Sequence, residues 1–351
     1  MSKTPSEHAK PQRRWKRWLI GILAGIAAVA VLLCGTFGVL YLMGRATLRP
    51  RGSTLSAPQD LLDDAEEDFS RITYQGVDYR YNQDVIAVLI IGVDKKAIAT
   101  DLGYGQNGQA DSLFVAAIDT ARGVTRIIPL SRESMVDINI YGVGGGYAGV
   151  KKAQLCLAYA YGATGVESCQ NVITSAKRLL YGVDINAYAA IDLDGLSALT
   201  HEVGGVTVTA PEDVRKGALN VKKGDTVTLT KDTVAPYVRY RGSDVEANNR
   251  RQTRQQQFLT AFIKKAKGQI AKDLSRVTDL YNVAEPYLVS SLDVADLTYL
   301  ASNSLSALGN IQYLSIKGDT VMGEEYVEFH PDRTSVYETV LEAFYRPVEG
   351  E

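Results

Sequence analysis

The chain contains 351 residues, 46% of them hydrophobic, which is enough to bury one large core or two smaller ones. Its formal net charge of -2 argues against a general nucleic-acid binder, because such proteins are usually basic overall. The three cysteines and three histidines lack ligand-like spacing, which argues against a zinc site. Cys156 and Cys169 could pair outside the cytoplasm, although buried free thiols are the favoured interpretation.

An uncharged apolar run, residues 18–44, predicts one transmembrane helix, because about 20 apolar residues span a bilayer. A cleavable signal peptide would have a shorter apolar run. Residues 1–17 are rich in arginine and lysine, and an acidic stretch soon follows the apolar run. The positive-inside bias therefore places residues 1–17 in the cytoplasm and the later residues outside the cell. We expect a single-pass membrane protein with a linker at 45–71 and an extracellular domain at 72–348.

Strands and helices alternate along this domain. A hairpin with Gln75-Gly76 at its turn leads into a buried strand at 85–93. Further strands are expected at 111–120, 125–131, 185–193, 206–210, 311–316 and 326–329. Helices are expected in the region 155–183 and at 194–205, 250–272, 274–308 and 335–345. The alternation predicts a single αβα-type α/β domain with a central mixed sheet covered on both faces.

Two carboxylates stand at the ends of predicted neighbouring strands. Asp94 ends the first buried strand, and Asp111 opens the next one. Ligands of such folds bind at the carboxyl ends of the strands, and two carboxylates there could share a hard cation, with phosphate and water completing its oxygen shell. The alternative is that each aspartate only caps a turn. Arg132 follows a third strand, where it could bind an anion or form a surface salt bridge with Glu133.

The segment at 237–259 concentrates arginines in a chain that is slightly acidic overall. They are Arg239, Arg241, Arg250, Arg251 and Arg254. The sequence predicts a helix that starts near Arg250 with Asn248 or Asn249 as its cap, and that carries Arg251, Arg254, Gln255 and Phe258 on one stripe. Cations in the first turn oppose the helix dipole, whereas an anion bound there is favoured. Arginine forks bind phosphate oxygens bidentately, so we favour a phosphate site.

Two questions about this segment stay open at the level of sequence. The arginines could instead form a solvated basic face, balanced by Asp244 and Glu246. The side chains of Arg239 and Arg241 point the same way only if YVRYR is an extended strand, and the sequence does not decide this.

Four blocks together resemble the LytR-CpsA-Psr family of membrane-anchored cell-wall phosphotransferases of Gram-positive bacteria. They are VLIIGVD, QADSLFVAAID, IIPLSRES and YVRYR…NNRRQTRQQQFL, spread over about 85–265. The resemblance implies Mg²⁺-assisted transfer of a phosphoglycosyl unit from a polyprenyl-diphosphate-linked glycopolymer to peptidoglycan. The implied partners are that glycopolymer, peptidoglycan and membrane lipid, and no nucleic acid. The alternative is a non-catalytic or pyrophosphatase-type polyprenyl-diphosphate-binding protein with a regulatory role.

The resemblance also implies roles for individual residues. Asp94 and Asp111 correspond to the metal-associated carboxylates. The diphosphate-binding positions correspond to Arg132, Arg239, Arg241, Arg251 and Gln255, and catalysis is assigned to Asp111, Arg132 and Arg251.

The chain departs from the family pattern at four positions. Gln109 replaces an arginine, Glu133 and Asn248 replace aspartates, and Gln154 replaces a lysine. These changes leave the base that activates the acceptor open, with Glu133 as a candidate. A transcriptional role would need a cytoplasmic nucleic-acid module, and residues 1–17 are too few to fold as one.

Overall fold

The structure, a computed structural model, describes residues 38–48, 64–65, 70–95, 98, 104, 107–142, 144–217, 219–242, 247–304 and 307–348. The membrane span predicted at 18–44 lies mostly outside these residues. Among the described residues, no helix has both the length and the apolar character needed to cross a membrane. Residues 38–48 are helical, so residues 45–48 continue the helix instead of starting an extended linker.

Six strands form the central sheet, in the order β14-β9-β4-β5-β6-β15. They are β4 (Val85–Val93), β5 (Ala110–Asp119), β6 (Val124–Leu130), β9 (Ala187–Asp192), β14 (Leu288–Ser290) and β15 (Ile311–Tyr313). Because β4 pairs antiparallel with β5 and parallel with β9, the sheet is mixed, as the sequence predicted.

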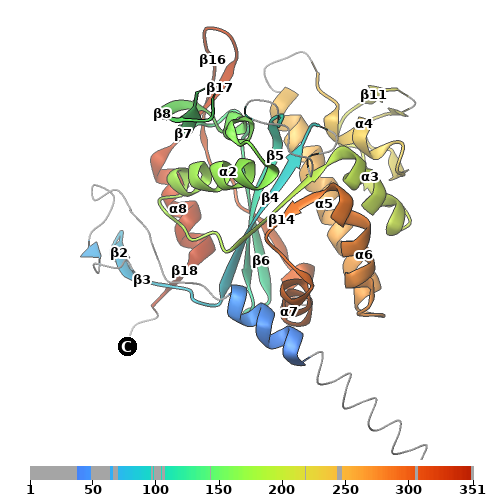
Figure 1. The fold of residues 1–351 in the computed structure, drawn as a ribbon, viewed down its shortest axis with the longest axis horizontal. Helices are drawn as coiled ribbons and strands as arrows, with labels where there is room; N and C mark the ends of the chain where they lie inside the picture. Colours follow the sequence, from blue (N-terminus) through green and yellow to red (C-terminus); the bar gives the residue numbers. More distant parts are fainter. Residues whose placement is uncertain are drawn as a thin grey trace, which may run out of the picture.

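Helices cover both faces of this sheet (Figure 1). On one side lie α2 (Gly165–Leu179) and α8 (Arg333–Phe344). On the other side lie α3 (Leu193–Glu202), α5 (Ala247–Ile270), α6 (Arg276–Ala284) and α7 (Val294–Ser304). The remaining helical segments are α4 (Val234–Arg239), η2 (Leu155–Tyr161), η3 (Glu285–Tyr287) and η4 (Ala307–Gly309).

The two faces of β4 belong to different cores. Leu89 and Ile91 point into the largest core, which α2 and α8 complete. Ile86 and Val88 point to the opposite face and belong to a smaller cluster. A strand that is buried on both faces reads as a continuous apolar run, which is why the sequence predicted β4 with its observed bounds.

Small ribbons and a second sheet surround the central layers. β1 (Asp64–Ala65), β2 (Arg71–Tyr74), β3 (Val77–Tyr81) and β18 (Tyr345–Pro347) form a four-stranded sheet. The two-stranded ribbons are β7 (Met135–Tyr141) with β8 (Tyr147–Gln154), β10 (Val206–Thr209) with β13 (Thr226–Leu229), β11 (Val214–Lys216) with β12 (Leu219–Val221), and β16 (Gly318–Met322) with β17 (Val327–Pro331). The predicted turn between β2 and β3 is confirmed, with positive φ at Gln75 and Gly76.

The structure differs from the predicted elements in the arginine segment. The conformation of YVRYR, which the sequence left open, is helical up to Arg239, which ends α4. Helix α5 begins at Ala247, earlier than predicted, and Asn248 and Asn249 therefore lie within its first turn and do not cap it. Short strands such as β11 and β12 were not predicted, because three-residue ribbons leave too little alternation to recognise.

Candidate functional site

A cavity of about 450 Å³ lies between the carboxyl end of β4 and the helices α3 and α5. Its mouth is polar and its depth is apolar. The polar lining consists of Asp94, Asp111, Ser112, Asp192, Lys216, Arg239, Arg241, Arg251 and Gln255. The structure thus places every site residue that the sequence predicted, except Arg132, in the wall of one cavity, and Arg132 contacts Asp111 from behind.

Both predicted carboxylates pair with arginines. Asp94 accepts a hydrogen bond from Arg239 Nη2 at 2.8 Å. Asp111 Oδ1 lies 3.2 Å from Arg132 Nε, although that N–H forms no hydrogen bond. Burial raises the pKa of Asp94, and the neighbouring Asp111 acts in the same direction against the effect of Arg239. The two carboxylates are therefore close enough to repel each other, which is the arrangement that a shared cation would relieve.

A third carboxylate, Glu133, balances Arg241. Its Oε1 lies 3.5 Å from Arg241 Nη2, and its side chain is only 6% exposed. The alternative pairing of Arg132 with Glu133 is wrong, because Arg132 turns to Asp111. Burial raises the pKa of Glu133, while Arg241, Arg132 and Arg251 oppose that rise. Glu133 therefore lies against the cations of the site, although it does not line the cavity itself.

Arg251 is the most enclosed arginine of the cavity wall. Its Nη2 donates to Asn248 Oδ1 at 2.6 Å, and Asn248 lies three residues earlier on the same helix. Burial lowers the pKa of Arg251, and the nearby Arg132 and Arg241 act in the same direction. These guanidinium groups thus repel one another across the mouth of the cavity. An anion placed there would relieve that repulsion.

The other two arginines of the segment have a structural role. Arg254 donates to Glu212 and to the carbonyl oxygens of Tyr237 and Tyr240, and it is 1% exposed. Arg250 donates to Glu212 Oε2 at 2.9 Å. The residues predicted to share one stripe of α5 therefore have different roles. Arg254 is held by Glu212, whereas its neighbours Arg251 and Gln255 line the cavity.

A layer of polar groups supports Arg132 from outside the cavity wall. Its Nη2 donates to Gln109 and contacts Cys156 Sγ at 3.3 Å. Burial raises the pKa of the Cys156 thiol, so this sulfur is a neutral contact in the structure. Cys156 and Cys169 are both buried free thiols, as the favoured interpretation of the sequence held. No spacing in the sequence indicated the contact between Cys156 and Arg132.

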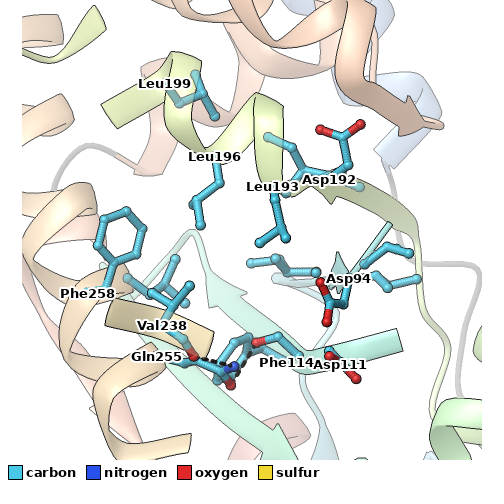
Figure 2. A pocket seen from close by; sticks show the side chains of 18 of the residues that line it. Asp94, Asp111, Phe114, Asp192, Leu193, Leu196, Leu199, Val238, Gln255 and Phe258 are labelled. Atoms are coloured by element: carbon cyan, nitrogen blue, oxygen red, sulfur yellow. Dashed lines mark hydrogen bonds between the residues drawn. The ribbon is translucent and has the colours of Figure 1, made fainter. Parts of the chain in front are cut away.

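The depth of the cavity is lined by apolar side chains from both layers. Figure 2 shows Leu193 and Leu196 projecting from α3 towards the sheet, with Phe258 of α5 beside them. Phe114 of β5 forms part of the floor, and Gln255 accepts a hydrogen bond from Ser112 Oγ at 3.0 Å near the mouth. The cavity can therefore take a ligand that is anionic at one end and apolar along the rest of its length.

The model of the LytR_cpsA_psr family matches residues 55–343, and the chain belongs to that family. It is 22% identical over 328 residues to the polyisoprenyl-teichoic acid–peptidoglycan teichoic acid transferase TagU of Oceanobacillus iheyensis, with 93% of each chain covered.

Two solved structures show the same fold. Bacillus subtilis TagV superposes with a TM-score of 0.59 at 23% identity, covering 74% of this chain and 97% of TagV. TagT bound to LI-WTA superposes with a TM-score of 0.57 at 20% identity, covering 74% of this chain and 90% of TagT.

The division of the arginines gives a direct prediction about stability. Arg254→Met should lower the free energy of unfolding by about 1–3 kcal/mol, because the carbonyl oxygens of Tyr237 and Tyr240 lose a buried donor while Glu212 keeps Arg250. Arg251→Met should leave the free energy of unfolding unchanged or raise it, because one of several mutually repelling cations is removed. Urea unfolding of the two variants measures both effects. Equal destabilisation by the two substitutions would contradict the division.

Proposed function

We propose that the protein transfers a phosphoglycosyl unit from a polyprenyl-diphosphate-linked glycopolymer to peptidoglycan. The observation that supports this most strongly is the cavity itself, which joins an arginine-lined mouth to an apolar depth. A polyprenyl diphosphate has the same two parts in the same order. The names of the curated relatives, which are teichoic acid transferases, support the same class of substrate and acceptor.

The arginines and carboxylates of the mouth would exchange partners when the substrate binds. Arg239 and Asp94 form one pair without substrate, and Arg132 and Asp111 form another. A diphosphate would accept hydrogen bonds from the guanidinium groups in place of these carboxylates, as bidentate phosphate recognition requires. Gln255 and Arg251 border the same space and would contact the remaining diphosphate oxygens. The apolar side chains of α3 and α5 would hold the first part of the polyprenyl chain.

The proposed reaction is a displacement at the phosphorus atom that carries the glycan. An acceptor hydroxyl oxygen forms a bond to that phosphorus, and the bond to the bridging oxygen breaks, which leaves polyprenyl monophosphate. The hydroxyl proton passes to a base, for which Glu133 is the candidate because it is a buried carboxylate of raised pKa facing Arg241 and Arg251. Catalysis here depends on charge neutralisation and positioning more than on a covalent intermediate. Arg132 and Arg251 would stabilise negative charge that develops on the phosphoryl oxygens.

Mg²⁺ fits the carboxylate pair at the mouth. The proximity of Asp94 and Asp111 favours a cation between them. The described residues contain no group of three or more His, Cys, Asp or Glu that could hold a metal, so phosphate oxygens and water would have to supply its other ligands. Mg²⁺ usually binds through one or two carboxylates together with substrate phosphates and water. When bound, it would supply positive charge to the diphosphate oxygens.

The proposal includes the membrane location that the sequence predicted, with residues 18–44 as the span and the domain outside the cell. A lipid-linked substrate and a peptidoglycan acceptor are both found there. The helical residues 38–48 form the described end of that segment.

Asp111→Asn should lower Mg²⁺-dependent transfer by about 100-fold or more, because the site loses the charge that holds a cation and orients Arg132. The side chain keeps its shape, so the melting temperature should change little. The assay uses purified lipid-diphosphate oligosaccharide and peptidoglycan, with and without Mg²⁺. Asp319→Asn makes the same chemical change on the exposed strand β16 and should keep full activity. Full Mg²⁺-dependent turnover by Asp111→Asn would remove the metal assignment, and release of free glycan phosphate without transfer would favour the pyrophosphatase alternative.

A short-chain polyprenyl diphosphate should raise the melting temperature of the protein. Binding to the native state alone adds about 2.7 kcal/mol at a hundredfold excess over Kd. Arg251→Met should weaken this shift strongly, and Arg251→Lys should restore only part of it, because a point charge cannot make the bidentate contact. Arg215→Met on the exposed part of β11 is the matched control. An undiminished shift in Arg251→Met would show that the diphosphate binds elsewhere.

A further inference from the structure

The helical residues 38–48 dock directly on α7. A Cβ atom built on Gly44 would lie 2.9 Å from Tyr299 Cβ and against the backbone of Ala295, so only glycine permits this approach. One turn earlier, the Tyr41 ring meets the Tyr299 ring edge-to-face at 5.2 Å. The Tyr41 hydroxyl also donates to Asn303 Oδ1 at 3.2 Å. The helix is therefore held by backbone contact, ring packing and a hydrogen bond.

The last residue of this helix is buried in the domain. Leu48 is 1% exposed and belongs to the small cluster on one face of β4 and β5. That cluster includes the cross-strand pairs Ile86 with Ile118 and Val88 with Ala116. The residues directly after the predicted membrane span thus reach into a core of the domain and are not a free tether.

The same sheet face continues from this cluster into the cavity. The next cross-strand pairs, Ile90 with Phe114 and Gly92 with Ser112, line the cavity, and Asp94 follows at its mouth. Val88, Ile90 and Leu292 border both the cavity and the Leu48 cluster. From Ile86 to Asp94 the strand rises by about 26 Å, at about 3.3 Å per residue. The buried cluster around Leu48 therefore adjoins the apolar end of the cavity, and the same strand leads from there to the diphosphate site.

The outer side of the docked helix is apolar and uncovered. Val39, Leu42 and Met43 are 57%, 62% and 55% exposed. They continue the uncharged apolar run that starts at residue 18. Lipid is the partner that fits this side, because an exposed apolar patch continuous with a predicted membrane span has the composition of a bilayer-facing surface.

We infer that residues 38–48 are a positioning element that fixes the apolar end of the cavity at the membrane surface. The polyprenyl chain then passes from the bilayer beside this helix into the apolar end of the cavity, which Val88, Ile90 and Leu292 border, and reaches the diphosphate site. This inference rests on the proposed function and adds a route and an orientation to it. A domain on a flexible linker would sample many orientations relative to the membrane. A docked domain keeps the cavity facing the membrane-held substrate and so raises the effective concentration of that substrate.

Gly44→Leu in the full-length protein tests this inference, with Gly38→Leu as the matched control. Both substitutions add the same side chain to the same helix, but a Cβ atom at Gly38 meets nothing within 4 Å. Transfer is measured with a long-chain substrate in lipid vesicles and with a short-chain substrate in solution. Gly44→Leu should lower the vesicle rate by about tenfold or more and leave the solution rate nearly unchanged, because loss of geometry removes the gain in effective concentration. Gly38→Leu should change neither rate.

Crosslinking gives a readout that does not depend on turnover. In a Cys34→Ser background, Tyr41→Cys and Asn303→Cys should be joined by a short bismaleimide in membranes. Adding Gly44→Leu should reduce the crosslink, and adding Gly38→Leu should not.

Three results would overturn the inference. They are a vesicle rate unaffected by Gly44→Leu, an equal loss with both substrates, and a crosslink insensitive to Gly44→Leu. If the unsubstituted protein transfers neither substrate, the proposed function fails and the inference fails with it. An active protein with a normal Gly44→Leu variant removes the inference alone.

Discussion

The repulsion between guanidinium groups at the mouth of the cavity is the constraint on which the site depends. Arg132 and Arg241 lie close enough to Arg251 to disfavour its charge, and each of these two neighbours pairs with a carboxylate, Asp111 and Glu133 respectively. In each of these ion pairs a diphosphate could take the place of the carboxylate beside the arginine. A cation could take the place of the arginine beside the carboxylate. The mouth is thus stable when empty and still retains a preference for an anion. Arg254 shows the opposite case, a buried arginine whose partners are fixed and which faces no ligand space.

The apolar half of the site comes from the sheet geometry. Alternate residues of β4 point to opposite faces, so one set completes the large core and the other lines the cavity and the Leu48 cluster. Glycine at position 92 leaves room beside Ser112 near the mouth, because an ideal Cβ on Gly92 would lie 3.0 Å from Ser112 Cβ. The carboxylates of the mouth and part of the apolar lining of the cavity therefore come from one pair of neighbouring strands, β4 and β5.

Much of this arrangement could be predicted from the sequence, for identifiable reasons. β4 and β5 are long apolar runs, and the residues at their ends, Asp94 and Asp111, meet because adjacent strands end at one edge. The family blocks located Arg132, Arg239, Arg241, Arg251 and Gln255, which the structure brings to one mouth or directly behind it.

Other features depend on tertiary contacts that sequence spacing does not encode. Helical periodicity placed Arg254 with Arg251, but Glu212, 42 residues away in the chain, holds Arg254 outside the cavity. Leu196 and Phe258 have the pattern of ordinary core residues, and only the placement of α3 and α5 on either side of the cavity leaves space beside them. The docking of Gly44 on α7 could not be predicted either, because it depends on a contact with residues far away in the chain. A glycine within an apolar run indicates only a membrane helix.

The most direct test of the account is photolabelling with a polyprenyl diphosphate analogue that carries a photoreactive group near the start of its isoprenoid chain. The account predicts adducts on the cavity-facing residues of α3 and α5, above all Leu196 and Phe258, and their loss when excess unlabelled polyprenyl diphosphate is present. Adducts confined to other surfaces, or labelling that unlabelled diphosphate does not compete away, would contradict it.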